Sequence, residues 1–245
     1  MNRSETMLAP SSRLDPFLSD LRARSVYFSM TDLKIAFYGG SFDPPHLGHM
    51  AIANALLRQF ELDEFVMLPA FHAPHKKRAA PTSAFDRYAM LSLMTANEPR
   101  ISISKLEIEE PTPTYTVDTL MRLKSMLRDV KIFFVMGADS WSQIRTWREW
   151  ESVLTLTDHI VVTRPGCPLG VEHVTAYIRE RIVDLRGSDT GIPEDGQEHI
   201  YLTNAVEVDI SATNIRRMIR EGDEEWRAQV PKEVANYIEK YQIYT

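Results

Sequence analysis

The sequence is poor in cysteine, in long apolar runs and in excess positive charge, and each shortage excludes a class of protein. Cys167 is the only cysteine, so an intramolecular disulfide is impossible and a reducing compartment is the simpler prediction. No apolar run approaches the roughly 20 residues that a membrane-spanning helix needs. Lys and Arg number 28 against 34 Asp and Glu, a net charge of −6, which leaves no overall basic field for nucleic acid. We therefore expect a cytoplasmic protein that binds neither membrane nor nucleic acid.

The bulk composition is that of an ordinary globular protein. The chain has 245 residues, of which 44% are apolar and 25% charged, enough for one sizeable core. Residues 1–32 differ, because they are rich in Ser and Arg, are interrupted by Pro10 and Pro16, and lack the apolar core of a signal peptide. We interpret residues 1–32 as a non-catalytic N-terminal extension and residues 33–245 as a single catalytic domain.

Segments typical of strands and of helices alternate along almost the whole domain. Strands are predicted at 33–38, 64–69, 101–104, 131–136, 159–163 and 200–208, and helices at 50–60, 83–93, 117–127, 141–144, 147–154, 171–185, 211–221 and 231–241. In the last helix, the residues expected to face inward are Val234, Tyr237, Ile238 and Tyr241. The alternation predicts an α/β fold, a Rossmann-like, doubly wound and mostly parallel sheet with helices on both faces. Ligands of such sheets bind beyond the carboxyl ends of the strands, where the strand order reverses.

One glycine- and histidine-rich stretch, residues 39–49 (the glycine–histidine loop), joins the first strand to the first helix. It reads Gly-Gly-Ser-Phe-Asp-Pro-Pro-His-Leu-Gly-His. Free backbone N–H groups and the positive end of the helix make such a turn a site for anions. His46 and His49, three residues apart, can share one helix face and add donors. The loop is neither a P-loop nor a G-x-G-x-x-G motif. We favour a phosphate cradle over a turn with only a structural role.

A metal site is the alternative interpretation of the histidines. Together with His72 or His75, the pair His46 and His49 could form a tri-histidine zinc site. However, no carboxylate or thiol stands at ligand spacing around them, and residues 76–78 are Lys-Lys-Arg. Positive charge disfavours a dication and favours phosphate. We therefore predict no metal bound directly by the protein.

Two motifs carry a resemblance to a known family. The glycine–histidine loop resembles the first signature of the nucleotidyltransferase superfamily, an H-x-G-H element whose histidines contact ATP phosphates. Residues 210–216, Ile-Ser-Ala-Thr-Asn-Ile-Arg, resemble its second signature, Ile-Ser-x-Thr-x-Ile-Arg. Over residues 33–245 the chain is most similar to the bacterial nicotinate-nucleotide adenylyltransferases. Members of that family join ATP and nicotinate mononucleotide into nicotinate adenine dinucleotide and release pyrophosphate.

The resemblance implies how ATP is held. His46 and His49 would donate to its phosphates, and Arg216 would bind the β- and γ-phosphates through its planar fork. Arg216 stands in the second turn of a helix that Ser211 and Thr213 are expected to cap. The residues expected to contact ATP besides these are Gly39, Gly40, Ser41, Phe42, Gly48, His75, Lys76, Gly137, Asp139, Ser211 and Thr213. Mg²⁺ is the expected cofactor, carried mainly by ATP and pyrophosphate oxygens.

The resemblance also implies an acceptor site. The Trp147 ring would stack on the nicotinate ring, and backbone groups at Tyr115 and Thr116 would meet its carboxylate. Arg148 stands where the family often has an aromatic residue, which departs from a two-ring sandwich. Two alternatives stay open here: the tryptophans of this region only pack helices, and Asp139 caps the helix that follows it instead of binding the adenosine ribose with Gly137.

The expected partners are ATP and nicotinate mononucleotide, and the sequence leaves a homo-oligomer open. Two other functions compete with this one. The first is a related adenylyltransferase that uses nicotinamide mononucleotide or pantetheine phosphate as acceptor. The second is a nucleotide-binding sensor without turnover, which would be expected to have lost a signature histidine or the arginine, whereas His46, His49 and Arg216 are all present.

Overall fold

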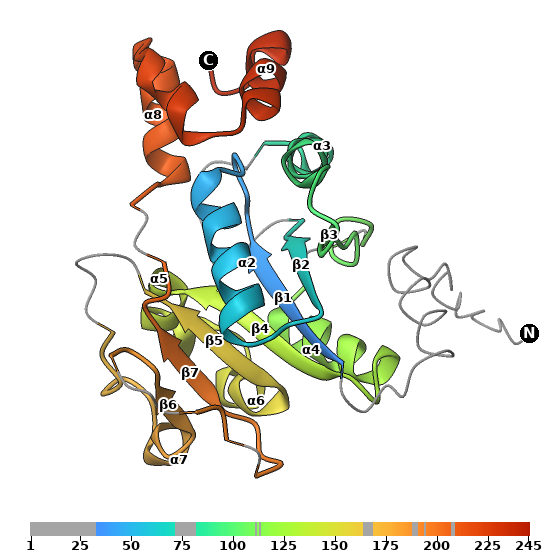
Figure 1. The fold of residues 1–245 in the computed structure, drawn as a ribbon, viewed down its shortest axis with the longest axis vertical. Helices are drawn as coiled ribbons and strands as arrows, with labels where there is room; N and C mark the ends of the chain where they lie inside the picture. Colours follow the sequence, from blue (N-terminus) through green and yellow to red (C-terminus); the bar gives the residue numbers. More distant parts are fainter. Residues whose placement is uncertain are drawn as a thin grey trace, which may run out of the picture.

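The computed structural model describes residues 33–71, 82–110, 112, 114–163, 169–187, 191–193, 195–206 and 209–245. The strands in these ranges are β1 Lys34–Gly40, β2 Glu64–Pro69, β3 Ile101–Ile103, β4 Lys131–Gly137, β5 Asp158–Val162, β6 Ile182–Asp184 and β7 Ile200–Thr203. They form one seven-stranded sheet in the order β3-β2-β1-β4-β5-β7-β6, and all neighbouring strands are parallel (Figure 1). The predicted Rossmann-like α/β fold is confirmed.

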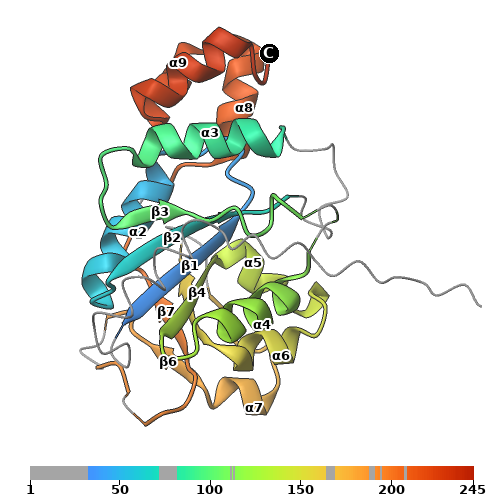
Figure 2. The same cartoon turned by 90° about the vertical axis from the view of Figure 1, so that its right-hand side faces the viewer.

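Helices cover both faces of this sheet. Those in the described residues are α2 Leu47–Gln59, α3 Ala84–Thr95, α4 Thr116–Met126, α5 Ala138–Ser142, α6 Trp150–Leu156, α7 Ala176–Arg179, α8 Ala212–Glu221 and α9 Lys232–Tyr241, with 3₁₀ turns η2 Ile144–Thr146 and η3 Glu224–Gln229. One face packs against α2 and the opposite face against α4 and α6 (Figures 1 and 2). No helix in the described part of the chain is long and apolar enough to span a membrane.

The central strands are apolar because both of their faces are buried. Along β1, Ala36 and Tyr38 belong to the core cluster that contains α2, whereas Ile35 and Phe37 belong to the cluster that contains α4 and α6. A strand in the middle of a parallel sheet has no solvent face, so its sequence shows a continuous apolar run instead of alternation. This explains why the strands at 33–38 and 131–136 were readable from the sequence.

The strand order reverses between β1 and β4. From β1 the chain builds outward through β2 and β3, then returns to place β4 on the other side of β1. The carboxyl ends of these two neighbours, at Gly40 and Gly137, therefore lead into connections that leave in opposite directions. In open α/β sheets this arrangement opens a crevice for ligands.

The C-terminal helices pack together with α3 at one end of the molecule (Figure 2). The hydroxyl of Tyr237 on α9 donates a hydrogen bond of 2.9 Å to Oδ1 of Asp86 on α3. Val234 and Ile238 of α9 are buried, as predicted, and Tyr237 is half-buried. Tyr241, which was expected to face inward, is 54% exposed. It lies in the last turn of α9, beyond the part of the helix that packs on the core.

The predicted helix at 171–185 is wrong. The structure has only the short α7 there, followed by strand β6, which pairs with β7 through Ile182 opposite Ile200 and Val183 opposite Tyr201. The β-branched residues at 182 and 183 favour a strand once a sheet edge is available to pair with them. A helical hydrophobic pattern in the sequence cannot reveal that edge.

Three predicted boundaries also shift. The helix expected at 147–154 begins at Trp150, because Glu149 before it has a left-handed backbone with φ of 50°. The strand expected to reach residue 208 ends at Thr203, whose hydroxyl accepts a hydrogen bond from the N–H of Ala205. The strand expected at 101–104 ends one residue earlier, at Ile103.

Candidate active site

Segments far apart in the chain meet at the β1/β4 switch. The pocket there is lined by Tyr38, His46, Gly48, His49, Ile52, Gly137, Val162, Thr163, Val206 and Ile210. These residues come from the glycine–histidine loop and α2, from the carboxyl ends of β1, β4 and β5, and from the segment that leads into α8. The two sequence motifs, at 39–49 and 210–216, are therefore adjacent in space, as a shared site requires.

The histidine pair is held in one geometry at the start of α2. His46 is the N-cap residue and is 4% exposed. Its ring stacks on the ring of His49, with centroids 3.7 Å apart and planes 28° apart. The backbone N–H of His46 donates to Nδ1 of His49 at 3.1 Å. Because Nδ1 of His49 accepts, its neutral ring carries the proton on Nε2, where it can be donated to an anion.

Gly48 makes room for the His46 ring. A Cβ at position 48 would lie 3.0 Å from Nδ1 and 3.1 Å from Cε1 of His46. Gly39 and Gly40 also make room for aromatic rings. A Cβ at position 39 would lie 2.8 Å from the Phe134 ring, and a Cβ at position 40 would lie 3.0 Å from the Phe42 ring. The protein's own aromatic packing thus accounts for these three glycines before any ligand is considered.

Gly137 differs from the glycines of the loop. No heavy atom lies within 4 Å of a Cβ added there, and the residue lines the pocket. Packing alone therefore does not require glycine at this position. Asp139 follows as an exposed residue in the first turn of α5, whose N-cap is Gly137. The alternative in which Asp139 is the N-cap is wrong, because Gly137 holds that position and Asp139 comes two residues later along the chain.

Phe42 and Ser41 shape the loop from inside. Phe42 is 2% exposed, with φ of 48°, and its ring lies 4.9 Å from the ring of His49. Its side chain therefore supports His49 from the core, which leaves only its backbone for the predicted contact with ATP. Ser41 is half-buried, and its carbonyl accepts a hydrogen bond of 2.6 Å from Arg87.

Arg216 of the second motif lies over the glycine–histidine loop. One of its terminal nitrogens, Nη1, donates to the carbonyl of Asp43, and the other donates to the hydroxyl of Thr213 at 3.3 Å. Its side chain is 28% exposed, so the guanidinium reaches solvent beside the loop. Ser211 is the N-cap of α8 as predicted, but its side chain makes no capping hydrogen bond. Thr213 holds the arginine rather than the helix end.

The predicted acceptor residues lie around the N-terminus of α4. Tyr115 is the N-cap and Thr116 the first residue of this helix, where backbone N–H groups have no partner within the helix. Trp147 is half-buried at the end of η2. Arg148 links the two segments: its Nη1 lies 3.6 Å from Oδ2 of Asp118, and its guanidinium lies 5.0 Å from the centre of the Tyr115 ring.

The tryptophans of this region separate into two kinds. Trp141 is 1% exposed and donates from Nε1 to the carbonyl of Gly170 at 2.9 Å, so it belongs to the core. Trp147 and Trp150 are only partly buried at the edge of the same core cluster. The packing alternative is therefore confirmed for Trp141, while Trp147 keeps part of its ring at the surface.

The chain is similar to known proteins in sequence and in fold. The family model described as Cytidylyltransferase-like matches residues 37–218, a span that includes both motifs. A relative from Streptomyces coelicolor, described as "Probable nicotinate-nucleotide adenylyltransferase", is 37% identical over 206 residues, covering 84% of this chain and 98% of its own. A relative of the same description from Desulfatibacillum aliphaticivorans is 34% identical over 223 residues, covering 86% of this chain and 100% of its own.

The chain belongs to the nicotinate-nucleotide adenylyltransferase family. Its fold is also that of a solved structure, the Plasmodium falciparum nicotinic acid mononucleotide adenylyltransferase complexed with NaAD. That structure has a TM-score of 0.68 and 20% identity, and the match covers 86% of this chain and 97% of the other. A second structure of the Plasmodium falciparum enzyme, complexed with APC, has a TM-score of 0.65 at the same identity.

Two of the residues predicted to contact ATP, His75 and Lys76, lie outside the described residues, as does the tri-histidine alternative that depends on His72 or His75. Among the residues that the structure does describe, no group of three His, Cys, Asp or Glu side chains is placed to hold a metal ion.

Arg87 is a residue beside the glycine–histidine loop that the sequence alone did not reveal. It is 0% exposed on α3, and burial lowers the pKa of its guanidinium, an effect that the nearby Asp43 opposes. Its donors reach four carbonyls, those of Ser41 at 2.6 Å, Ala70 at 2.7 Å, Phe71 at 3.1 Å and Thr82 at 3.0 Å. One side chain thus ties the glycine–histidine loop to both ends of the 71–82 connection. A signal existed: position 87 shares the helix face of the buried Met90 and Leu91.

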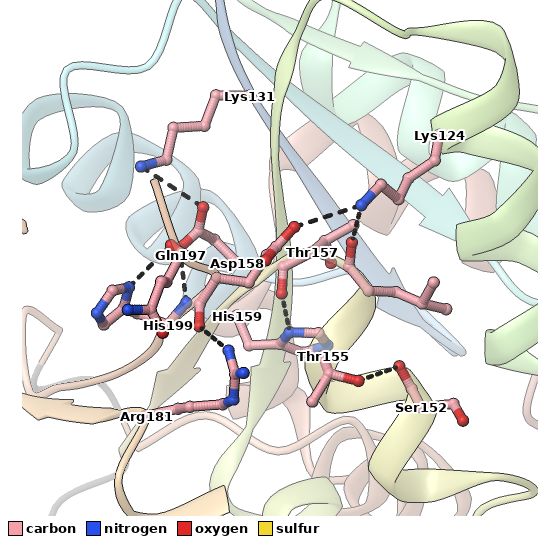
Figure 3. Close-up of polar contacts among 12 residues, drawn as sticks. Lys124, Lys131, Ser152, Thr155, Thr157, Asp158, His159, Arg181, Gln197 and His199 are labelled. Carbon is pink, nitrogen blue, oxygen red and sulfur yellow. Dashed lines mark hydrogen bonds and ion pairs between the residues drawn. The ribbon is translucent and has the colours of Figure 1, made fainter. Parts of the chain in front are cut away.

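A cavity larger than the pocket at the switch lies at the opposite end of the sheet, at the start of β4 and β5. It has a volume of about 230 Å³. Four of its charged side chains form two pairs: Lys131 Nζ lies 3.5 Å from Oδ2 of Asp158, and Lys124 Nζ lies 3.3 Å from Oε1 of Glu198 (Figure 3). Ligands of parallel α/β sheets bind at the carboxyl ends of the strands. We therefore assign the active site to the smaller pocket at the β1/β4 switch.

Proposed function

We propose that this protein transfers the adenylyl group of ATP to nicotinate mononucleotide, giving nicotinate adenine dinucleotide and pyrophosphate in NAD biosynthesis. One observation carries the proposal. In this member of the nicotinate-nucleotide adenylyltransferase family, His46 and His49 line the pocket at the β1/β4 switch, and Arg216 of the distant second motif donates to the carbonyl of Asp43 in the same glycine–histidine loop. Structures of a Plasmodium falciparum member complexed with NaAD and with APC support a nucleotide site on this fold.

The phosphates of ATP would lie between the start of α2 and Arg216. The first backbone N–H groups of α2 and the proton on His49 Nε2 supply donors from one side. Arg216 supplies a planar, permanently charged fork from the other side, suited to the β- and γ-phosphate oxygens. These groups neutralise charge that would otherwise repel a second phosphorylated substrate, and they favour departure of pyrophosphate.

The reaction needs alignment more than proton transfer. The nucleophile is an oxygen of the nicotinate mononucleotide phosphate, which is already ionised at neutral pH, so no general base is required. It attacks the α-phosphorus of ATP, a new P–O bond forms, and the bond to the pyrophosphate oxygen breaks. The stacked His46 and His49 rings would hold the two polyanions in line for this attack, because the geometry of the rings is already fixed before substrate binds.

The adenosine of ATP and the nicotinate ring of the acceptor would lie on either side of the phosphates. We assign the space beside Gly137 to the adenosine ribose, because an open Cβ direction leaves room there, with Asp139 as acceptor for a hydroxyl. We assign the nicotinate ring to Trp147 and its carboxylate to the N–H groups at Tyr115 and Thr116, where the N-terminus of α4 favours an anion. Donors of this kind prefer the acid over the neutral amide.

Mg²⁺ would bind at this site mainly through the phosphate oxygens of ATP. None of the described residues that line the pocket has a carboxylate, and the Asp43 carboxylate of the glycine–histidine loop already accepts hydrogen bonds from Tyr244 and from the N–H of Thr82. Mg²⁺ commonly binds through phosphate oxygens and water with few protein ligands, and bound in this way it screens the negative charge of the phosphates. A cytoplasmic location and a homo-oligomer stay predictions.

An acceptor panel tests the proposal. Purified protein with ATP, Mg²⁺ and nicotinate mononucleotide should release pyrophosphate, with nicotinate adenine dinucleotide as the second product. Nicotinamide mononucleotide should react far more slowly, and pantetheine phosphate should not react. Equal rates with the acid and the amide would contradict the acceptor assignment. ATP binding without turnover of any acceptor would instead support the sensor.

A further inference from the structure

The C-terminal segment reaches back to the glycine–histidine loop. α9 ends at Tyr241, its C-cap Gln242 adopts a left-handed backbone with φ of 52°, and the N–H of Ile243 donates to the carbonyl of Ile238 at 3.0 Å. This is the usual way in which a helix stops and the chain turns aside. The turn brings the half-buried Tyr244 against Asp43, and its hydroxyl donates to Oδ1 of Asp43 at 2.7 Å.

Asp43 lies between two arginines. It is 9% exposed, its charge acts on the buried Arg87, and its Oδ2 is 4.0 Å from Nη1 of Arg216. Yet both carboxylate oxygens are engaged with neutral donors: Oδ1 with the hydroxyl of Tyr244, and Oδ2 with the N–H of Thr82 at 3.4 Å. Arg216 therefore donates to the backbone carbonyl of Asp43 rather than forming a close bidentate pair with its carboxylate.

We propose that Tyr244 is a positioning residue that holds the Asp43 carboxylate away from Arg216 and thereby keeps Arg216 available to the phosphates of ATP. A carboxylate and a guanidinium at this separation gain most from two parallel hydrogen bonds. The hydrogen bond from the Tyr244 hydroxyl to Oδ1 instead holds the carboxylate in an orientation in which Oδ2 stays 4.0 Å from Nη1 of Arg216. Without it, Asp43 turns to Arg216, and ATP has to compete with an internal anion. This inference rests on the proposed contact of Arg216 with ATP phosphates.

Tyr244→Phe is the test, because it removes the hydroxyl and keeps the ring in place. Tyr237→Phe is the matched control: it removes another tyrosine–aspartate hydrogen bond of the same C-terminal segment, at 2.9 Å, whose partner Asp86 is not at the pocket. The dissociation constant for ATP, measured without acceptor, should rise roughly three- to tenfold in Tyr244→Phe, the range that one ordinary hydrogen bond covers. It should stay within about twofold in Tyr237→Phe, while both variants melt at similar temperatures.

A double-mutant cycle with Arg216→Ala separates this inference from the proposed function. Arg216→Ala alone should weaken ATP binding, and adding Tyr244→Phe should then cause no further loss, because the residue through which Tyr244 acts is gone. Full additivity of the two losses would overturn the inference, as would equal ATP affinities in the Tyr244→Phe and Tyr237→Phe variants. An unchanged ATP affinity in Arg216→Ala would overturn both the inference and the proposed role of Arg216.

Discussion

Replacing Gly48 by Ala would test whether the geometry of the histidine pair matters to the reaction. The added Cβ would lie 3.0 Å from Nδ1 and 3.1 Å from Cε1 of His46, and 3.6 Å from Cβ of Ile210. Contacts to His46 that are this short require its ring to move by a few tenths of an ångström. The ring is stacked on His49 at 3.7 Å, so a shift of the His46 ring also changes its contact with His49. The substitution therefore displaces both donors.

Stability and activity should change in different proportions. Alanine in place of glycine within a helix gains about 0.5–1 kcal/mol, which offsets much of the strain at His46, so the melting temperature should change little. A misplacement of roughly 1 Å at a catalytic group can cost about 100-fold. For a shift of a few tenths of an ångström, we expect a loss of about tenfold in kcat/KM.

The assay is steady-state release of pyrophosphate, with the melting temperature measured on the same samples. Gly191→Ala is the control, because no heavy atom lies within 4 Å of its added Cβ and its φ is not in the left-handed region. This control should match the wild type in both measurements. If Gly48→Ala keeps its full kcat/KM while folded, then the position of the His46 ring is not part of the mechanism.

Four further predictions follow from the same site and core. His49→Ala should lose about 1.5–3 kcal/mol of transition-state stabilisation, at least about tenfold in kcat, with unchanged turnover as the contrary result. Gly137→Ala should leave the melting temperature unchanged and weaken ATP binding, since its Cβ meets no protein atom; tight binding would remove the ribose assignment. Deleting residues 1–30 should leave activity intact, and a folded but inactive protein would contradict the assignment of this segment as an extension. Burial raises the pKa of Glu107 to about 7 and lowers the pKa of His159 to about 4. The contribution of Glu107 to the free energy of unfolding therefore falls as the pH rises from about 4.5 to 7. The contribution of His159 grows as the pH rises from about 4 to 6.5. These two dependences oppose each other in the wild type. In Glu107→Gln only that of His159 remains, so the free energy of unfolding from denaturant titrations should rise by roughly 1 kcal/mol per pH unit between pH 5 and 6. A free energy of unfolding that does not change with pH in this variant would contradict the prediction.

The strands at the centre of the fold could be predicted because their residues are almost all apolar. β1 and β4 are buried on both faces, so their sequences are continuous apolar runs that allow few other interpretations. The segment at 171–185 failed for the opposite reason. Strand β6 is a partly exposed edge of three residues, and its identity depends on β7, which comes 16 residues later along the chain.

The site shows the same division. His46, His49 and Arg216 were predicted because two motifs name them, and the structure brings these two motifs into contact through Arg216 and the carbonyl of Asp43. Arg87 and Tyr244 belong to no motif that we recognised, and they act through partners 46 and 201 residues away. Contacts at such separations are created by the fold. A single sequence records the residue types involved but not that they meet.

The central claim is that the protein joins ATP to nicotinate mononucleotide by attack at the α-phosphorus. The most direct measurement follows ATP labelled at the α-phosphorus in the presence of Mg²⁺ and an equimolar mixture of nicotinate mononucleotide and nicotinamide mononucleotide. The account predicts that the label appears in nicotinate adenine dinucleotide, with little in the amide dinucleotide and with unlabelled pyrophosphate released. Label that stays in ATP, or that appears in AMP with no dinucleotide formed, would contradict it.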